Sequence, residues 1–103
     1  MPIMEIGVIP LGTKTPSVSR YVAEAVKMLK NEKGIRYVLF SMGTVVEADS
    51  VEKLLEIAGK MHRVVFSEEV KRVVTTIKID ERKDKNLTME EKIESVKQKM
   101  TGG

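Results

Sequence analysis

Charged side chains alternate along a stretch in the last third of the sequence, which makes it a clear candidate for chemistry. Alternate residues of a strand project from one face, so these side chains would gather on the same side if the strand continued. They could form the charged lip of a site for a polar ligand, or an ion-pair ladder at the surface that contributes little to stability. The stretch comprises Lys78, Asp80, Arg82 and Asp84, and the residues that could join it from neighbouring strands are Glu5, Thr44 and Glu47.

Side chains that commonly act in catalysis are scarce in this sequence. It contains no cysteine, which excludes thiol nucleophiles, disulfides and thiolate metal sites. The single histidine, His62, falls in an expected helix, where a lone histidine is typical of the surface or of the boundary of the core. We therefore predict that the protein is not an enzyme and that it holds no metal and no cofactor.

The segment Gly12-Thr13-Lys14-Thr15 is similar in composition to a phosphate-binding loop. It lacks the spacing of such a loop, because no Gly-Lys-Ser/Thr follows four residues after a first glycine. Two interpretations remain open. The segment is either a plain connection between a strand and a helix, or an anion site made by backbone amides at the start of that helix.

The elements that would position these residues are arranged around the stretch 35–48. β-Branched and aromatic residues fill this stretch, which predicts two strands joined by a tight turn at Met42-Gly43. Gly43 is expected to make the reversal, because glycine adopts a positive φ without steric cost. A helical pattern lies on each side of this hairpin, and a further strand lies beyond each helix, at Ile3 to Ile9 and at Lys71 to Asp80.

Pro10 is expected to end the first strand, because proline cannot donate to a sheet ladder. The first helix should then start with Pro16 and run to about Glu32. Its cap is Thr15 or Ser17. The apolar stripe of this helix comprises Val18, Tyr21, Val22, Ala25, Val26 and Leu29.

Two further helices are predicted. Asp49 is expected to cap the second, with Glu52 reaching back to the amide of Asp49. A capping box of Thr88 and Glu91 predicts that a last helix begins after Thr88. The apolar stripe of the second helix comprises Val51, Leu54, Leu55, Ala58, Met61 and Val65, and that of the last helix comprises Met89, Ile93, Val96 and Met100.

This order of elements, β-α-β-β-α-β with an additional C-terminal helix, predicts an α+β fold. Right-handed crossovers would place the first two helices on one face of a four-stranded antiparallel sheet, as in a ferredoxin-like plait. We expect the first and fourth strands to form the central pair, and residues 1–103 to form one domain. The other face of the sheet stays uncovered unless something packs on it, so we expect ligand and partners there or at the sheet edge.

Composition narrows the classes of partner. Of the 103 residues, 42% are hydrophobic and 32% are charged, and no apolar run reaches the roughly 18–20 residues that span a bilayer. Lysines are interleaved with acids and the net charge is only +3, which favours a solvated surface over a nucleic-acid groove. With no export signal, we expect a cytoplasmic protein that binds neither membranes nor nucleic acids.

Two other functions of the same plait lack the residues that they need. An RNA-binding domain would stack bases on exposed aromatic residues of its central strands, and neither the first nor the fourth strand contains an aromatic residue. An acylphosphatase-like enzyme would need an arginine in the loop after the first strand and an asparagine on the hairpin. The loop has Lys14 and no arginine, and the hairpin has no asparagine.

Four motifs occur in an order that is specific as a set. They are IPLGT (9–13), SVSRYVA (17–23), MGT (42–44) with Glu47, and IKIDERKD (77–84), followed by a closing helix that contains Lys92 and Ser95-Val96. In these motifs, and over residues 3–100, the sequence resembles the small thiamine-binding protein family. It departs from the family's usual pattern at Ser41, where a proline is common, and at Ala48, where a glycine commonly follows the glutamate.

The resemblance implies a ferredoxin-like fold and homo-oligomers built from dimers, expected here as tetramers. It also implies binding of thiamine or its hydroxymethylpyrimidine part without catalysis. The alternative is a structural or regulatory assembly module that binds another small molecule.

A site for an aminopyrimidine needs a carboxylate, a hydroxyl and a flat apolar wall, because this ring offers an amino donor, nitrogen acceptors and a π-face. Glu47 is the carboxylate expected to accept from the ligand's amino group. We expect these groups to converge near the ends of the hairpin and the first loop. The candidate ligand-binding residues are Glu47, Thr44, Met42, Ser17, Ser19, Thr13, Phe40 and Lys78.

Overall fold

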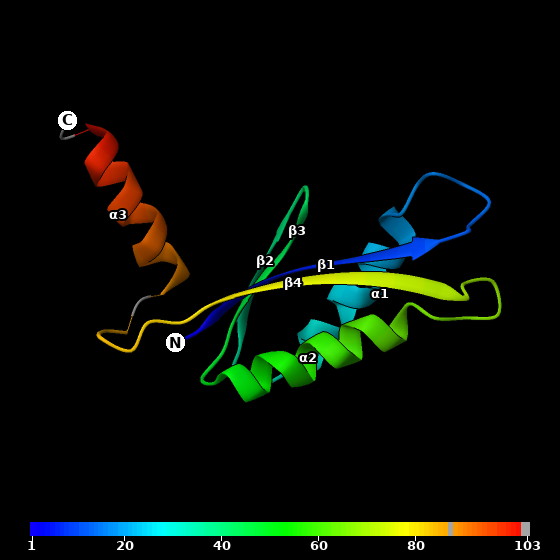
Figure 1. The fold of residues 1–103 in the computed structure, drawn as a ribbon, viewed down its shortest axis with the longest axis horizontal. Coiled ribbons are helices and arrows are strands. Elements are labelled where there is room, and N and C mark those ends of the chain that lie inside the picture. Colours follow the sequence, from blue (N-terminus) through cyan, green and yellow to red (C-terminus); the bar gives the residue numbers. More distant parts are fainter. Residues whose placement is uncertain (87, 102–103) are drawn as a thin grey trace.

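A four-stranded antiparallel sheet with two helices packed on one face forms the body of the computed structural model, which describes residues 1–86 and 88–101 (Figure 1). A third helix stands off one end of the sheet. The elements are β1 (Ile3–Leu11), α1 (Ser19–Lys27), the 3₁₀ helix η1 (Met28–Asn31), β2 (Arg36–Phe40), β3 (Gly43–Glu47), α2 (Val51–Val64), β4 (Arg72–Asp80) and α3 (Met89–Thr101). The predicted element order and the α+β class are confirmed.

The strand order is β2-β3-β1-β4, the order of a ferredoxin-like plait. β1 and β3 are therefore the central pair, and the expectation that β1 and β4 lie at the centre is wrong. The reason lies in the pairing. β4 pairs with β1 over its whole length and is an edge strand, whereas a tight turn keeps β3 beside β2 and the other side of β3 pairs with β1.

The hairpin turn is shifted by one residue from the predicted position. Phe40 pairs with Gly43, so Ser41 and Met42 form the turn, and Gly43 does not have a positive φ. What requires glycine here is space, because a Cβ at position 43 would lie 3.1 Å from the carbonyl oxygen of Ile6 on β1. Gly43 therefore allows a close approach of two strands rather than a reversal of the chain.

β1 does not end at Pro10 as predicted but continues to Leu11. β3 pairs with β1 only as far as Ile6, so the later part of β1 has β4 on one side and an open edge on the other. Proline is tolerated in a strand at such an edge, because no ladder hydrogen bond is needed there.

α1 begins at Ser19, later than predicted, and its N-cap is Val18 without a side-chain cap. The Thr15 hydroxyl, one of the two expected caps, bonds within the preceding loop instead. The Thr15 Oγ1 accepts from the Ser17 amide at 3.2 Å, and the Thr13 Oγ1 donates to the Thr15 carbonyl at 2.8 Å. These local turns compete with helix formation and delay its start.

The other two helix starts differ in how well they were predicted. α2 is capped by Ser50, whose Oγ accepts from the Lys53 amide at 3.1 Å, and not by Asp49. In the last helix, the Thr88 Oγ1 accepts from the Glu91 amide at 3.2 Å, so the predicted cap at Thr88 is confirmed.

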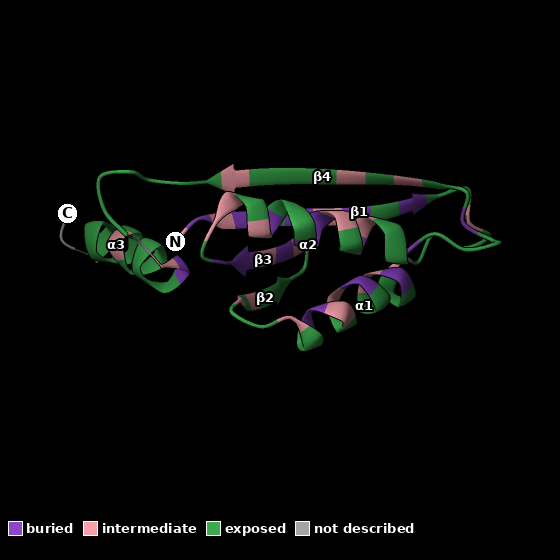
Figure 2. Cartoon of the chain, turned by 90° about the horizontal axis from the view of Figure 1, so that it is seen from below, coloured by how far each residue is buried: buried purple, intermediate pink, exposed green. Residues whose placement is uncertain are grey.

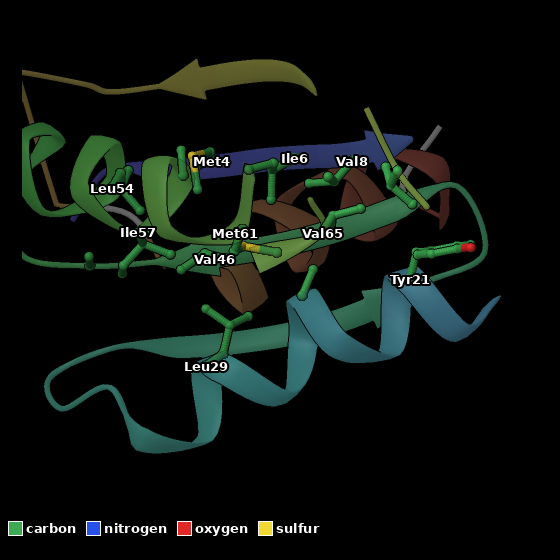
Figure 3. Close-up of a cluster of buried hydrophobic side chains, with 14 residues drawn as sticks. Met4, Ile6, Val8, Tyr21, Leu29, Val46, Leu54, Ile57, Met61 and Val65 are labelled. Atoms are coloured by element: carbon green, nitrogen blue, oxygen red, sulfur yellow. The ribbon is translucent and has the colours of Figure 1, made fainter. Parts of the chain in front are cut away.

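The core lies between the helix-bearing face of the sheet and α1 and α2 (Figure 3). Burial follows the layers, with the inner faces of both helices buried and their outer faces exposed (Figure 2). The predicted stripe of α2 wrongly includes Leu55, which is 51% exposed, and omits Ile57, which is fully buried. The largest fully buried apolar side chains are Met4, Ile6, Leu29, Leu54, Ile57, Met61, Val46, Val65 and Val70.

Candidate functional site

The predicted site residues on the strands lie on opposite faces of the sheet. Glu47 is paired with Ile3 on β1, on the face opposite to the helices, whereas Thr44 is 2% exposed and points into the helix-covered side with Val46. Thr44 and Glu47 therefore do not converge. The open face carries Glu47, Phe40 and Lys78 of the predicted set.

A cavity of about 390 Å³ lies on the open face, between the sheet and the first turn of α3. Phe40 and Lys78 line it, and we call it the sheet–α3 pocket. Residues from β1, β2, β3, β4 and α3 line this open-sided pocket, among them Glu5, Val45, Asp80, Met89 and Lys92. Glu47 is not part of the lining.

Glu47 lies beneath α3 and is only 1% exposed. Its Oε2 accepts from the backbone amide of Met89, the first residue of α3, at 3.3 Å, and lies 3.8 Å from the Arg36 guanidinium. Among the residues that the structure describes, the buried Oε1 has no hydrogen-bond partner. A buried carboxylate oxygen without a donor is costly, so this atom is well suited to a donor from a ligand.

Two ion pairs and one buried side chain attach α3 to the sheet. Arg36 pairs with Glu90, and Asp80 pairs with Lys92. The Lys92 ammonium, which donates to the Asp80 carboxylate, lowers the pKa of that carboxyl. Met89 is 7% exposed, whereas the rest of the predicted stripe of α3 faces solvent. The exposed residues of that stripe are Ile93, Val96 and Met100.

A second, apolar cavity of about 200 Å³ lies between α1 and the hairpin, and we call it the hairpin pocket. Thr44 and Met42 of the predicted set line it, and Phe40 lines both this pocket and the sheet–α3 pocket. It offers the Thr44 hydroxyl but has no charged side chain in its lining.

The first loop forms a third cavity of about 310 Å³, lined by Thr13 and Ser17 among others. Its arginine, Arg20, already donates to the Tyr21 hydroxyl at 3.0 Å and lies 3.7 Å from Glu69. Ser19 is not part of the lining, although its hydroxyl lies 3.3 Å from that of Ser17.

This loop cavity is remote from Glu47. Glu47 lies beside Ile3 at the start of β1, whereas the loop follows Leu11 at the end of the strand. Nine residues of extended chain span roughly 30 Å, so one small molecule cannot contact both places in one chain. The expected convergence of hairpin, first loop and Glu47 is therefore not found.

The charged lip is only partly as predicted. Lys78 and Asp80 line the sheet–α3 pocket, whereas Arg82 donates to the carboxylate of Asp84, its Nε at 2.8 Å from Oδ1, in an exposed pair beyond the strand. Within residues 1–86 and 88–101, no group of three or more histidine, cysteine, aspartate or glutamate side chains could hold a metal ion.

Two groups at the site were missed by sequence reasoning. Arg36 is the cross-strand partner of Glu47, and Met89 contributes a backbone N–H. The charge of Arg36 at the start of a strand was a usable signal once the hairpin register was known, but a backbone amide leaves no signal in the sequence.

Comparisons with known proteins point to one family. The profile of the family described as thiamine-binding protein matches residues 4–97. The UPF0045 protein of Methanothermobacter thermautotrophicus is 44% identical over 96 residues, which cover 93% of this chain and 96% of that protein. The UPF0045 protein YqgV of Bacillus subtilis is 42% identical over 99 residues, which cover 93% and 94%.

Solved structures agree with the fold. A hypothetical protein from Methanocaldococcus jannaschii superposes with a TM-score of 0.83 at 38% identity, covering 93% of this chain and 95% of that one. A Thermotoga maritima protein, described with a proposed role in thiamine biosynthesis or salvage, superposes with a TM-score of 0.75. Its identity is 21%, with 92% and 97% of the chains covered, so this likeness concerns the fold alone.

Proposed function

Because the chain belongs to the thiamine-binding protein family, we propose that it binds thiamine or its hydroxymethylpyrimidine part in the sheet–α3 pocket, without catalysis. The observation that carries this proposal is the Glu47 carboxylate, which lies next to the pocket, under Met89 and beside Ile3 of its lining. This carboxylate is buried and has one oxygen without a partner among the described residues. The exocyclic amino group of an aminopyrimidine is a donor of the kind that this oxygen lacks.

The rest of the pocket suits the same ligand. Its volume of about 390 Å³ lies within the roughly 300–1,000 Å³ typical of small-molecule sites. Phe40 offers a flat wall for a heteroaromatic ring, and the Glu5 carboxylate would favour a cationic thiazolium. The hairpin pocket is smaller and its lining has no charged group, so it fits this ligand less well.

We propose that the protein is cytoplasmic and that it binds neither membranes nor nucleic acids. None of the described helices is long and apolar enough to cross a membrane. β1 and β3, the central strands, contain no aromatic residue on which bases could stack. A structural or regulatory assembly module remains the second candidate, favoured by the exposed apolar residues of the open face.

Calorimetric titration of the purified protein with thiamine and with hydroxymethylpyrimidine tests the proposal. We expect saturable binding of at least one compound, and native mass spectrometry should show the same ligand bound to the protein. If neither compound binds at millimolar concentration, the thiamine-related function is wrong and the assembly module becomes the leading candidate.

We also propose that the protein self-associates. It should form at least a dimer, and we expect a tetramer. Ile9 and Val74 are cross-strand neighbours on the open face and are 50% and 44% exposed, so a second copy would remove apolar surface from water. Light scattering at micromolar concentration should give at least twice the 11.6 kDa monomer mass.

Val74→Lys should shift this mass toward the monomer, because a lysine cannot be buried cheaply at a protein interface. Leu55→Lys is the matched control, since Leu55 is similarly exposed but lies on α2, in a groove beside Thr75 and Ile77 of β4 and away from the open face. A monomer mass for the wild-type protein, or an equal effect of both substitutions, would contradict this assignment.

A further inference from the structure

α3 begins directly on top of the carboxylate to which the proposed function assigns the ligand. The Glu47 side chain is 1% exposed, and the Met89 amide already occupies its Oε2. A ligand outside the protein therefore cannot reach this carboxylate while the first turn of α3 stays in place. Access requires that turn to move.

We propose that the first turn of α3 is a lid over Glu47. As the lid opens, the Met89 N–H leaves Oε2, and the amino group of a planar amino-heterocycle reaches the carboxylate, including the Oε1 that has no partner among the described residues. This inference rests on the proposed function for the identity of the ligand. It adds a conformational step, the opening of the first turn of α3. It also adds a competitor for the ligand, because the Glu47 carboxylate accepts from the Met89 N–H in the closed state and from the ligand in the open state.

The attachments of α3 are of the kind that open at small cost. The Arg36–Glu90 and Asp80–Lys92 ion pairs join side chains that are about half exposed, and such pairs contribute little to stability. Beyond Met89, the apolar side chains of the helix are at least half exposed, including Ile93, which lines the sheet–α3 pocket, so no extensive packing would be lost on opening. Regions with few buried apolar contacts are those that open locally in folded proteins.

The exchange also accounts for the chemistry of the ligand. Met89 presents a neutral, planar N–H donor to the buried Glu47 carboxylate. The guanidinium of Arg36 lies 3.8 Å from Oε2 of the same carboxylate. An amino group on a heteroaromatic ring is likewise a neutral, planar donor, whereas a free ammonium group would face the Arg36 charge. The site under the lid therefore suits the amino group of a planar amino-heterocycle.

A pair of substitutions at Met89 isolates the competing hydrogen bond. Met89 is the first helical residue, a position where proline is tolerated. Met89→Pro and Met89→Ala both remove the thioether side chain, but only proline removes the N–H. We expect Met89→Pro to bind thiamine or hydroxymethylpyrimidine about tenfold more tightly than Met89→Ala, because the closed state competes less well.

Hydrogen exchange of the amides of α3 gives a readout that a purely structural role of Met89 would not change. In the wild-type protein, saturating ligand should increase exchange in α3 while exchange in β1 and β3 stays slow. Met89→Pro should show the increased exchange in α3 without ligand, and Met89→Ala less so. An octylamine titration should show no comparable binding, which checks the ligand class.

The outcomes separate this inference from the proposed function. If the wild-type protein binds a ligand, but both variants bind equally and α3 exchange does not respond, the lid is overturned and the proposed function stands. If only Met89→Pro binds a ligand, the lid is supported, because the closed first turn of α3 then explains why the wild-type protein does not bind. If no form of the protein binds, both proposals are overturned.

Discussion

Glu47→Gln is expected to weaken the binding of thiamine and of hydroxymethylpyrimidine by roughly ten- to a hundredfold, which corresponds to about 1.5–3 kcal/mol. The glutamine keeps the size of the side chain and removes its charge, so the change isolates the charge-assisted hydrogen bond from packing. The effect should be large because Glu47 is buried, where a hydrogen bond to a charged acceptor is weakly screened by water.

Calorimetric titration of wild type and variant with both compounds measures this effect. Glu5→Gln is the matched control, because Glu5 lines the sheet–α3 pocket but is exposed, and its loss should change affinity only a few-fold. Thermal unfolding of both variants would show whether the fold is intact. Equal affinity of wild type and Glu47→Gln would remove Glu47 from the site.

Ile57→Ala should destabilise the protein by about 2–5 kcal/mol, because it deletes a fully buried side chain and leaves a cavity between α2 and the sheet. Leu55→Ala, two positions away on the same helix, should cost about 0.5 kcal/mol or less, because Leu55 is 51% exposed. The pair thus compares two similar aliphatic deletions that differ in burial.

Denaturant unfolding at one fixed protein concentration is the measurement, since any self-association makes stability depend on concentration. A cost for Leu55→Ala that matches that of Ile57→Ala would mean that another surface buries Leu55, such as a second copy packed against α2. In that case the surface around Leu55 would itself be a contact between copies.

Much of the fold could be predicted because its signals are local. The β-branched residues of the hairpin, the apolar spacing of the helices and the Thr88 cap each predicted an element that the structure contains. The errors were also local in origin. Thr15 offered a plausible cap but bonds to the Ser17 amide within its own loop, and a neighbouring serine, Ser50, caps α2 in place of Asp49.

The site was less accessible to sequence reasoning. Strand alternation already separates Thr44 from Glu47, because residues an odd number of positions apart in one strand point to opposite faces. Grouping them by residue type overlooked that constraint. The distance of the first loop from Glu47 follows from the register of β3 on β1, which pairs Glu47 with Ile3 at the end of the strand opposite to the loop.

By itself, then, the sequence determined which elements form, in what order, and which side chains each strand presents to the same face. These are properties of neighbouring residues. Only the tertiary structure decided that β3 lies beside β1, that Arg36 faces Glu47, and that the Met89 amide reaches a carboxylate 42 residues earlier in the chain. The physical reason is that strand register and helix docking depend on packing between distant segments, and a backbone N–H is the same in nearly every residue.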